Sequence, residues 1–356
     1  MDFFSTDNRN ALEAKEYAQW ISFAPVIFKA TKILRDSGIL KHIEKSRKTG
    51  IDIDQLVEKV DLSHYGVRVL LEAGLGIGLI TINNDKYSLT KTGYFIVNDE
   101  LTKVNFDFTN DVCYEPMMHL EDSIKNSKPE GLKVFGKWNT IYEGLSILPE
   151  PAKKSWFDFD HYYSDSAFEE VLPLVFTNKP KKILDIGGNT GKWSISCVKH
   201  NPDVHMTIMD LPGQTGLAKE NIRTQNLTER IGFYEANILD QTTVFPKGFD
   251  VVWMSQFLDC FSDDEIVSIL KRCVTALNED GYVYILETFW DKQRFEASAF
   301  CLQMTSLYFT AIANGNSQMY DSKVFLKLVT KAGLEVVEQI DNIGVCHTLL
   351  KCKKLK

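Results

Sequence analysis

Acids that follow apolar strands beside a glycine turn are the residues in this sequence best suited to do chemistry. An apolar run that includes Asp185 leads directly into Gly187, Gly188 and Gly191. Glycine lets the main chain turn tightly and lets a ligand approach it closely. Apolar residues at helical spacing follow Gly191, so the segment predicts a strand, a glycine loop and a helix, the opening unit of a doubly wound α/β sheet.

The details of this loop discriminate between ligands. A dinucleotide fingerprint requires glycines where Asn189 and Lys192 stand, and a Walker A phosphate loop does not match either. A carboxylate at Asp185 would repel a pyrophosphate and favour a cationic ligand. S-adenosylmethionine carries an ammonium and a sulfonium and no phosphate, so it suits this loop. The alternative is an ordinary strand-to-helix turn with a capping acid.

A second acid, Asp210, makes the cofactor site more specific. It ends the next apolar strand, Val204–Asp210, about 20 residues beyond the glycine turn, where a carboxylate can accept hydrogen bonds from a ribose diol. Pro212 suits the first turn of a helix, so Asp210 can also cap the helix that begins near Leu211. The two roles are compatible.

Polar residues at three further strand ends are predicted to reach the same edge of the sheet. Asn237 follows a third strand and offers an amide to an adenine edge. Asp259 lies in the loop after the strand Phe249–Ser255, just before a helix capped by Ser262, and Glu287 ends the strand after that helix. We expect the chemistry in this segment.

The first hundred residues predict a different kind of domain. Trp20–Leu34 is an unusually apolar helix, Asp52–Val60 and Ser63–Leu75 are shorter helices, and Leu79–Leu89 is a hairpin. Asp54 is the expected cap of the first short helix. Helices followed by a β-ribbon are typical of a winged helix.

A winged-helix domain can bind DNA or a second copy of the chain. DNA binding is disfavoured, because the two short helices carry more acidic than basic residues. The apolar excess of Trp20–Leu34 favours burial against a second copy of the chain, because homodimer interfaces are more apolar than ordinary surface. Packing against the second domain of the same chain is the alternative.

Residues 101–155 are predicted to form a mainly helical linker between the two halves. Its aromatic and methionine residues predict a wall of an aromatic-substrate pocket, with ordinary core packing as the alternative. These residues are Phe106, Phe108, Met117, Met118, Phe135 and Trp138.

The composition limits the class of protein. The chain has 356 residues, enough for two domains, and 44% of them are hydrophobic, as in globular proteins. Its formal net charge of -8 argues against nucleic-acid and anionic-membrane partners, which need a positive field. No apolar run has membrane-spanning length, and no signal peptide is apparent. The seven scattered cysteines and seven dispersed histidines suggest a cytoplasmic protein without a metal site.

From about residue 15 to its end, the sequence resembles the small-molecule O-methyltransferases of the caffeate and hydroxyindole type. Leu184–Gly191 is similar to the family's L-D-V-G-G-G-x-G, Asp210–Pro212 to its D-L-P, and Phe257–Asp263 to its x-L-H-D-W-S-D. The resemblance implies a winged-helix dimerisation domain in residues 1–100. It also implies a Rossmann-like class I methyltransferase domain, α/β with a mostly parallel seven-stranded sheet, in residues 156–356.

The resemblance assigns S-adenosyl-L-methionine as the cofactor and a set of positions around it. Gly187 and Asp210 would hold the methionine and ribose parts, and Asn237 with Ile238 would flank the adenine. The full set of expected cofactor positions is Asp185, Gly187, Gly188, Gly191, Asp210, Leu211, Asn237, Ile238 and Ser255.

The sequence departs from the family at the expected base. Asp259 stands where the family has a histidine that takes the acceptor's proton, and Glu287 matches a glutamate that orients this histidine. Reference pKa values of about 6.5 and about 3.9 make aspartate the weaker base by about 3.5 kcal/mol, unless burial beside Glu287 raises the pKa of Asp259. Three alternatives stay open. The acceptor can be acidic enough to ionise unaided, or His119 or His161 can reach the site as the base. Asp259 can also be a helix-entry residue without a catalytic role.

The sequence therefore predicts a homodimeric methyltransferase that acts on a hydroxyl of a small aromatic or quinonoid molecule, with Asp259 and Glu287 as its catalytic residues. Two alternatives stay open at this stage. One is a catalytically idle or repurposed S-adenosylmethionine-binding protein of the same fold, and the other is a winged-helix regulator that senses the cofactor.

Overall fold

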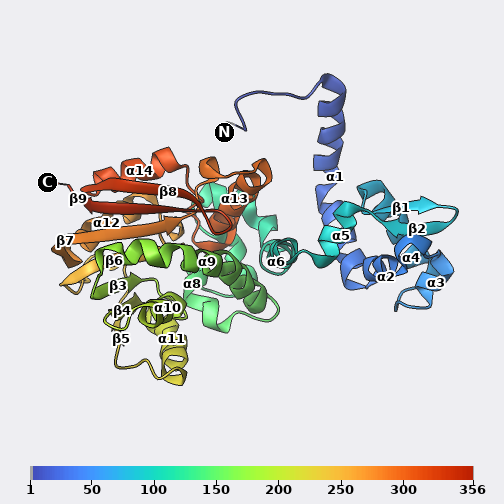
Figure 1. Ribbon diagram of the computed structural model, residues 1–356. Helices are drawn as coiled ribbons and strands as arrows, with labels where there is room; N and C mark the ends of the chain where they lie inside the picture. Colours follow the sequence, from blue (N-terminus) through green and yellow to red (C-terminus); the bar gives the residue numbers. More distant parts are fainter. Residues whose placement is uncertain (1–2, 356) are drawn as a thin grey trace. The chain divides into compact units, whose positions relative to one another are not determined.

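The structure is a computed structural model that describes residues 3–355. It divides into two compact units, residues 4–109 and the residues from 110 onward (Figure 1). In the part of the chain that the structure describes, no helix has the length and apolar character needed to cross a membrane.

The first unit is a set of helices with one β-hairpin. A two-residue turn closes the hairpin, and both of its residues, Asn84 and Asp85, have the positive φ that such a turn needs. The elements in chain order are α1 (Ala11–Asp36), α2 (Ile39–Ser46), α3 (Ile53–Val57), α4 (His64–Ile77), β1 (Ile80–Asn83), β2 (Lys86–Leu89), α5 (Lys91–Asn98) and α6 (Glu100–Phe108).

The expectation that Asp54 caps a helix was wrong. Asp52 is the cap of α3, because its backbone is extended and its side chain accepts a hydrogen bond from the Gln55 N–H at 2.8 Å. Asp54 already lies inside the first turn.

Helix α1 leaves much of its apolar surface uncovered within this unit. Trp20, Phe23 and Val26 are 39%, 60% and 62% exposed. Together with α4, this helix lines an apolar groove of about 380 Å³, which includes Phe23 and, on α4, Ile77. Exposed apolar area of this kind marks an interaction surface.

The second unit is built on one seven-stranded sheet with the order β5-β4-β3-β6-β7-β9-β8. Strands β3 to β7 run parallel, and β9 is antiparallel to both β7 and β8. The strands are β3 (Lys182–Ile186), β4 (His205–Asp210), β5 (Ile231–Glu235), β6 (Phe249–Ser255), β7 (Leu277–Glu287), β8 (Leu334–Ile343) and β9 (His347–Lys354). The mostly parallel sheet expected from the sequence is confirmed.

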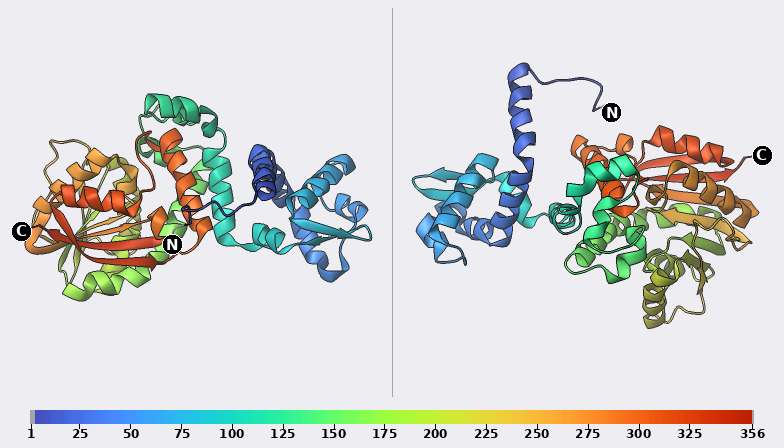
Figure 2. Two further views of the ribbon diagram at one scale, coloured as in Figure 1. Left: turned by 90° about the horizontal axis from the view of Figure 1, so that it is seen from above. Right: turned by 180° about the vertical axis from the view of Figure 1, so that it is seen from behind.

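Helices cover both faces of this sheet, as the three views show (Figures 1 and 2). The helices of this unit, not all of which lie on the sheet, are α7 (Leu120–Asn126), α8 (Ile141–Gly144), α9 (Ala152–Val175), α10 (Lys192–His200), α11 (Pro212–Thr224), α12 (Asp263–Ala276), α13 (Glu296–Tyr308) and α14 (Ser322–Lys331). Because the parallel strands are covered on both sides, they are apolar almost throughout.

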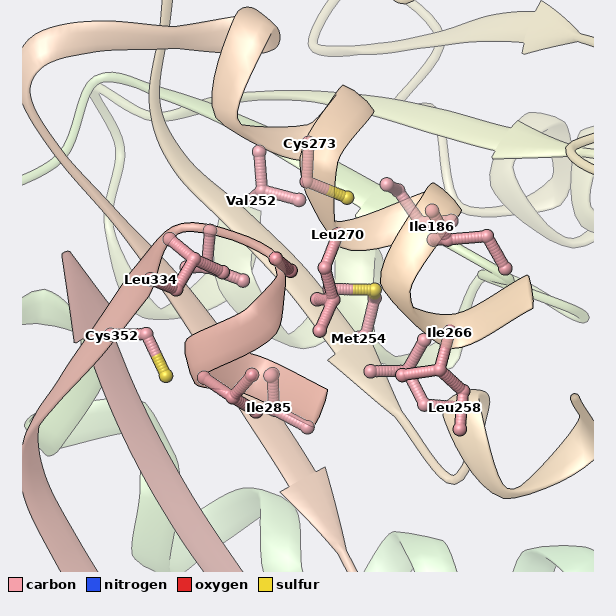
Figure 3. Packing of buried hydrophobic residues seen from close by; sticks show 14 of the residues in the cluster. Ile186, Val252, Met254, Leu258, Ile266, Leu270, Cys273, Ile285, Leu334 and Cys352 are labelled. Carbon is pink, nitrogen blue, oxygen red and sulfur yellow. The ribbon is translucent and has the colours of Figure 1, made fainter. Parts of the chain in front are cut away.

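Each face of the sheet has its own core. On one face α12 and α14 pack against the sheet, and Figure 3 shows Leu270 and Cys273 of α12 beside Val252 and Met254 of β6. On the other face lie α9, α10 and α11. The parallel strands therefore end at one edge, between two rigid layers.

Arg230 connects the chain segments that enter this sheet. Its guanidinium donates hydrogen bonds to three main-chain carbonyls, those of Val198 at 3.0 Å, Asn201 at 2.7 Å and Val204 at 2.6 Å. These carbonyls end α10 and precede β4, so the side chain fixes where β4 starts.

We predict that Arg230→Met lowers the free energy of unfolding by about 2 to 4 kcal/mol, because three carbonyls lose a charged donor. Arg223→Met is the matched control, since its partner Glu220 lies on the surface, and its effect should stay within about 0.5 kcal/mol. Urea unfolding measures both. Equal unfolding midpoints for the two variants would contradict the structural role of Arg230.

Candidate functional site

The glycine loop after β3 accepts no larger residue at its first position. Gly187 has a φ of +72°, and its N–H donates to the Met209 carbonyl at 2.9 Å. A Cβ atom at Gly187 would lie 2.2 Å from the ring of Phe257. The main chain at Gly187 therefore lies directly between β4 and the loop after β6. Without a side chain at this position, a ligand can approach the main chain closely.

Asp185 lies beneath this loop. The side chain is 2% exposed, and its Oδ2 accepts a hydrogen bond from the Ser194 hydroxyl of α10 at 2.6 Å. A Cβ atom on Gly188 would come within 2.9 Å of the same oxygen. Burial raises the pKa of Asp185 to about 7. Asp185 thus supports the loop from below. Because its side chain is buried there, it would influence a bound ligand by positioning the main chain of the loop.

Asp210 joins the glycine loop to the next helix. Its Oδ2 accepts the N–H of Asn189 at 2.9 Å, and its Oδ1 accepts the N–H of Leu211 at 2.7 Å. Burial raises the pKa of Asp210, while these two N–H groups act to lower it. Each oxygen keeps a lone pair for a further donor. The structure therefore brings Gly187, Asp210 and Leu211 together, as the sequence predicts.

The residues expected around an adenine lie at neighbouring strand ends. Asn237 is exposed, and its Oδ1 accepts the N–H of Leu239 at 3.0 Å, which leaves its amide N–H₂ group for a ligand. Ile238 is buried, and its carbonyl is bonded by Arg272 of α12. At the end of β6, the buried Ser255 hydroxyl has no hydrogen-bond partner.

The two candidate catalytic acids also come together at this edge. Glu287 is 1% exposed, and its Oε1 accepts two main-chain N–H groups, from Phe257 at 3.0 Å and from Leu258 at 2.8 Å. These bonds close the loop that carries Asp259, which is 4% exposed. The Glu287 carboxyl therefore fixes the position of Asp259.

The other side of this loop is held by the segment between α13 and α14. The Asn314 amide donates to the Cys260 carbonyl at 2.5 Å, and the Tyr320 hydroxyl donates to the Phe261 carbonyl at 2.7 Å. The helix α12 that follows starts with a capping box of Ser262 and Glu265, as expected. Asp259 is thus carried by a loop with little freedom.

Burial decides how the acid pair titrates. It raises the pKa of Asp259 to about 6, and it raises the pKa of Glu287 well above its usual value, with the charge of Asp259 adding to the effect. Glu287 accordingly keeps its proton more strongly, and Asp259 is the acid that ionises near neutral pH. The sequence-based expectation was that burial beside Glu287 raises the pKa of Asp259, and burial is the cause that raises it.

Sequence reasoning missed an acid on α9. Asp160 Oδ2 accepts a hydrogen bond from the Asn189 side-chain amide at 3.3 Å. Burial raises its pKa to about 7, and the charge of Asp259 contributes to the rise. Asp160 was missed because an acidic residue in a helix is ordinarily expected to face solvent. Its spacing of four residues from Trp156 was the available signal, because it places both side chains on one helix face.

Two tyrosine hydroxyls lie close enough to these acids to feel their charge. The Trp156 indole N–H donates to the Tyr308 hydroxyl at 2.7 Å, and the Tyr142 hydroxyl lies beside the Cys260 thiol. Burial raises the pKa of both tyrosine hydroxyls. The charge of Asp259 adds to the rise for Tyr142, and the charge of Asp160 adds to the rise for Tyr308.

The two histidines proposed as substitute bases are placed differently. His161 faces Asp165, with 3.7 Å between Nδ1 and Oδ1, and burial lowers its pKa. His119 lies in the 3₁₀ turn Pro116–His119. Among residues 3–355, no group of three or more His, Cys, Asp or Glu could hold a metal ion.

Several linker aromatics have packing roles. Phe106 stacks on Phe28 of α1 with ring centroids 4.4 Å apart, and Phe108 is buried. A Cβ atom on Gly144 would lie 2.5 Å from the Trp138 ring, so this indole packs directly on the main chain. Core packing accounts for these three residues.

Comparison with known proteins follows this geometry. Residues 15–87 match a family described as Dimerisation2-like domain, and residues 117–335, more than half of the chain, match a family described as O-methyltransferase domain. L-tyrosine C(3)-methyltransferase of Streptomyces lavendulae is 24% identical over 331 residues, which are 91% of this chain and 88% of that protein. O-methyltransferase 4 of Dictyostelium discoideum is 23% identical over 295 residues, 81% of this chain and 82% of that protein.

A solved structure shows the same fold. The S-adenosylmethionine-dependent methyltransferase SibL, in its apo form, has a TM-score of 0.72 at 18% identity, and the match covers 96% of this chain and 99% of that chain.

We predict that Gly187→Ala destabilises the protein by about 2 to 4 kcal/mol, because the new methyl group meets Phe257 and the φ is unfavourable for alanine. Gly213→Ala is the matched control, since a Cβ there meets no atom within 4 Å and helix α11 favours alanine. Urea unfolding followed by tryptophan fluorescence compares the two. If Gly187→Ala is no less stable than the control, the close approach of the loop to Phe257 is refuted.

Proposed function

Because this chain belongs to the O-methyltransferase family, we propose that it transfers the methyl group of S-adenosylmethionine to a hydroxyl of a small aromatic or quinonoid molecule. The observation that carries this proposal is the convergence of Asp210, Asp259 and Glu287 at one edge of the sheet, beside the glycine loop. S-adenosylmethionine supplies an activated methyl group when bound. The protein has to align the acceptor oxygen with it and leave that oxygen unprotonated.

The residues of the glycine edge fit this cofactor. The main chain at Gly187 and Gly188 admits a close ligand, and the lone pairs of Asp210 suit ribose hydroxyls. The free amide N–H₂ group of Asn237 and the buried, unpartnered hydroxyl of Ser255 suit an adenine. Asp185 and Gly191 then shape the loop, and Leu211 and Ile238 provide apolar contact.

Asp259 is the proposed base. With a pKa raised to about 6, its carboxylate is ionised at neutral pH and remains more basic than an ordinary aspartate. Glu287 holds the loop in place through Oε1 and so positions Asp259. A phenol that loses its proton becomes nucleophilic at oxygen and also at the neighbouring ring carbon. The product of turnover should therefore be analysed for both types of methyl group.

We also propose that the first unit forms a homodimer through α1. Its arrangement of helices and a hairpin supports a winged-helix domain, and its match to a Dimerisation2-like domain supports self-association. The apolar groove between α1 and α4 is the proposed contact surface. The part of the linker from residue 110 onward remains a proposed wall of the acceptor site, and the seven free cysteines support a cytoplasmic location.

The catalytic proposal makes a prediction about Asp259. Wild-type turnover of a phenol should rise with pH through about 6, because Asp259 is protonated below that value and accepts a proton only above it. Asp259→Asn should lower kcat by about 100-fold or more, with the Kd for S-adenosylmethionine unchanged, and Asp259→His should retain activity. Transfer of a labelled methyl group measures turnover, and calorimetry measures binding.

Asp264→Asn is the matched control, because it removes an exposed acid from the first turn of α12, which directly follows the loop of Asp259. Its rate should equal that of the wild type. An Asp259→Asn enzyme with full activity and the same pH profile would show that Asp259 has no catalytic role and only forms part of the turn before α12.

The dimer proposal predicts that the wild type has twice the monomer mass at micromolar concentration in light scattering. Phe23→Glu should shift it to the monomer, because a charge would be buried in the apolar contact. Ile82→Glu replaces an exposed residue of the hairpin and should leave the dimer intact. A wild-type monomer, or a Phe23→Glu dimer, would count against this surface.

A further inference from the structure

The carboxyl group of Asp259 has a side-chain donor in the next residue of the chain. Cys260 donates from Sγ to Asp259 Oδ1, with 3.4 Å between the two atoms. In the part of the chain that the structure describes, no other side chain donates a hydrogen bond to this carboxyl. The thiol therefore engages Oδ1 and leaves Oδ2 without a side-chain donor.

Hydrogen bonds at both of its peptide groups fix the position of Cys260. Its N–H donates to the Phe257 carbonyl at 3.2 Å, and its carbonyl accepts the Asn314 amide at 2.5 Å. Asn314 is held in turn, because its Oδ1 accepts the N–H and the hydroxyl of Ser317 at 3.2 and 2.9 Å. The Tyr142 hydroxyl of α8 lies beside the thiol as well. The thiol is thus presented to Asp259 from a fixed main chain.

The thiol keeps its proton at neutral pH and is therefore available as a donor. Burial raises the pKa of Cys260, and the charge of Asp259 adds to the rise. A thiol is a weaker donor than a hydroxyl. It can orient a carboxylate while stabilising the negative charge only slightly, so the carboxylate stays basic enough to accept a proton.

The sequence contains a matching change at this position. In the family motif x-L-H-D-W-S-D, an aspartate stands at the position of Cys260, directly after the histidine. Beside an aspartate base, a second ionised carboxylate would add a like charge and would have no proton to donate. The two neighbouring departures from the motif, Asp259 and Cys260, are therefore chemically compatible with each other.

We propose that Cys260 is a positioning residue whose thiol orients the carboxylate of Asp259, so that Oδ2 stays available for the proton of the acceptor hydroxyl. The inference rests on the proposed function, in which Asp259 is the base. The proton passes from the acceptor oxygen to Oδ2 of Asp259, and the thiol keeps its own proton throughout.

Four further titratable groups around Asp259 come from four other segments. They are Glu287 at the end of β7, Asp160 of α9, Tyr142 of α8 and Tyr320 before α14. Burial raises the pKa of each, so Glu287 and the two tyrosines stay neutral near pH 6, while Asp160, with a pKa raised to about 7, titrates nearby. All four are common to the wild type and the Cys260 variants, so a difference between these proteins reports the thiol.

The test compares Cys260→Ser and Cys260→Ala in the full-length protein. A hydroxyl is the stronger donor, so Cys260→Ser should lower the midpoint of the pH profile of kcat by at least about 0.5 pH unit and keep the plateau within about threefold. Cys260→Ala removes the donor, so it should raise the midpoint by at least about 0.3 pH unit. It should also lower the plateau about tenfold, with KM changed by less than about twofold, because the carboxylate loses its orientation.

A second readout does not depend on turnover. Carbon-13 NMR of protein labelled at the aspartate carboxyl carbons follows the titration of Asp259, whose resonance is the one that Asp259→Asn removes. Its midpoint should move down in Cys260→Ser and up in Cys260→Ala. Cys301→Ser and Cys301→Ala are the matched controls, because Cys301 is an exposed cysteine of α13, and neither should move it. Near-ultraviolet circular dichroism should be the same for all variants.

The proposal is overturned if both Cys260 variants keep the wild-type midpoints, or if both shift them in the same direction, as a change in packing would. It is also overturned if the NMR midpoint follows the two variants and the midpoint of kcat does not. A failure of the proposed function is distinguishable from these results. If the wild type binds neither S-adenosylmethionine nor S-adenosylhomocysteine and methylates no phenol, the methyltransferase proposal fails, and the NMR midpoints alone then confirm or refute the orientation of Asp259 by the thiol.

Discussion

The site depends on two carboxyl groups at the ends of parallel strands, each of which accepts hydrogen bonds from main-chain N–H groups. Asp210 accepts one N–H from the glycine loop and one from the start of α11, and Glu287 accepts two from the loop after β6. Where the carboxyl is ionised, such bonds are charge-assisted and fix a loop more strongly than neutral ones do. The sheet supplies the common edge, and these two carboxyl groups fix the loops that rise from it.

Much of this arrangement could be predicted from the sequence, because it follows from strand ends. Asp210, Asp259 and Glu287 each follow an apolar run, and parallel strands bring such positions to one edge. Asp160 could not be found in this way, since it lies on a helix that crosses a face of the sheet. The burial of Asp185 was also beyond the sequence, because only packing shows that Ser194 and Gly188 enclose its carboxyl.

The replacement of a histidine by Asp259 has a physical compensation in the structure. An exposed aspartate would be a poor base at neutral pH, but desolvation raises the pKa of Asp259 to about 6, close to the value of an unperturbed imidazole. Burial thus supplies basicity that the side chain lacks by itself. The cost falls on the fold, which has to hold the acid away from water.

Asn189 has a role that reaches beyond the loop. With a φ of +47°, it donates its main-chain N–H to Asp210 and its side-chain amide to Asp160. One residue therefore joins the proposed ribose-binding acid to the acid on α9. When a ligand at one of these acids orders Asn189, a ligand at the other gains or loses binding free energy by the same amount, because such coupling is reciprocal. If both ligands bind as proposed, their affinities are coupled through Asn189.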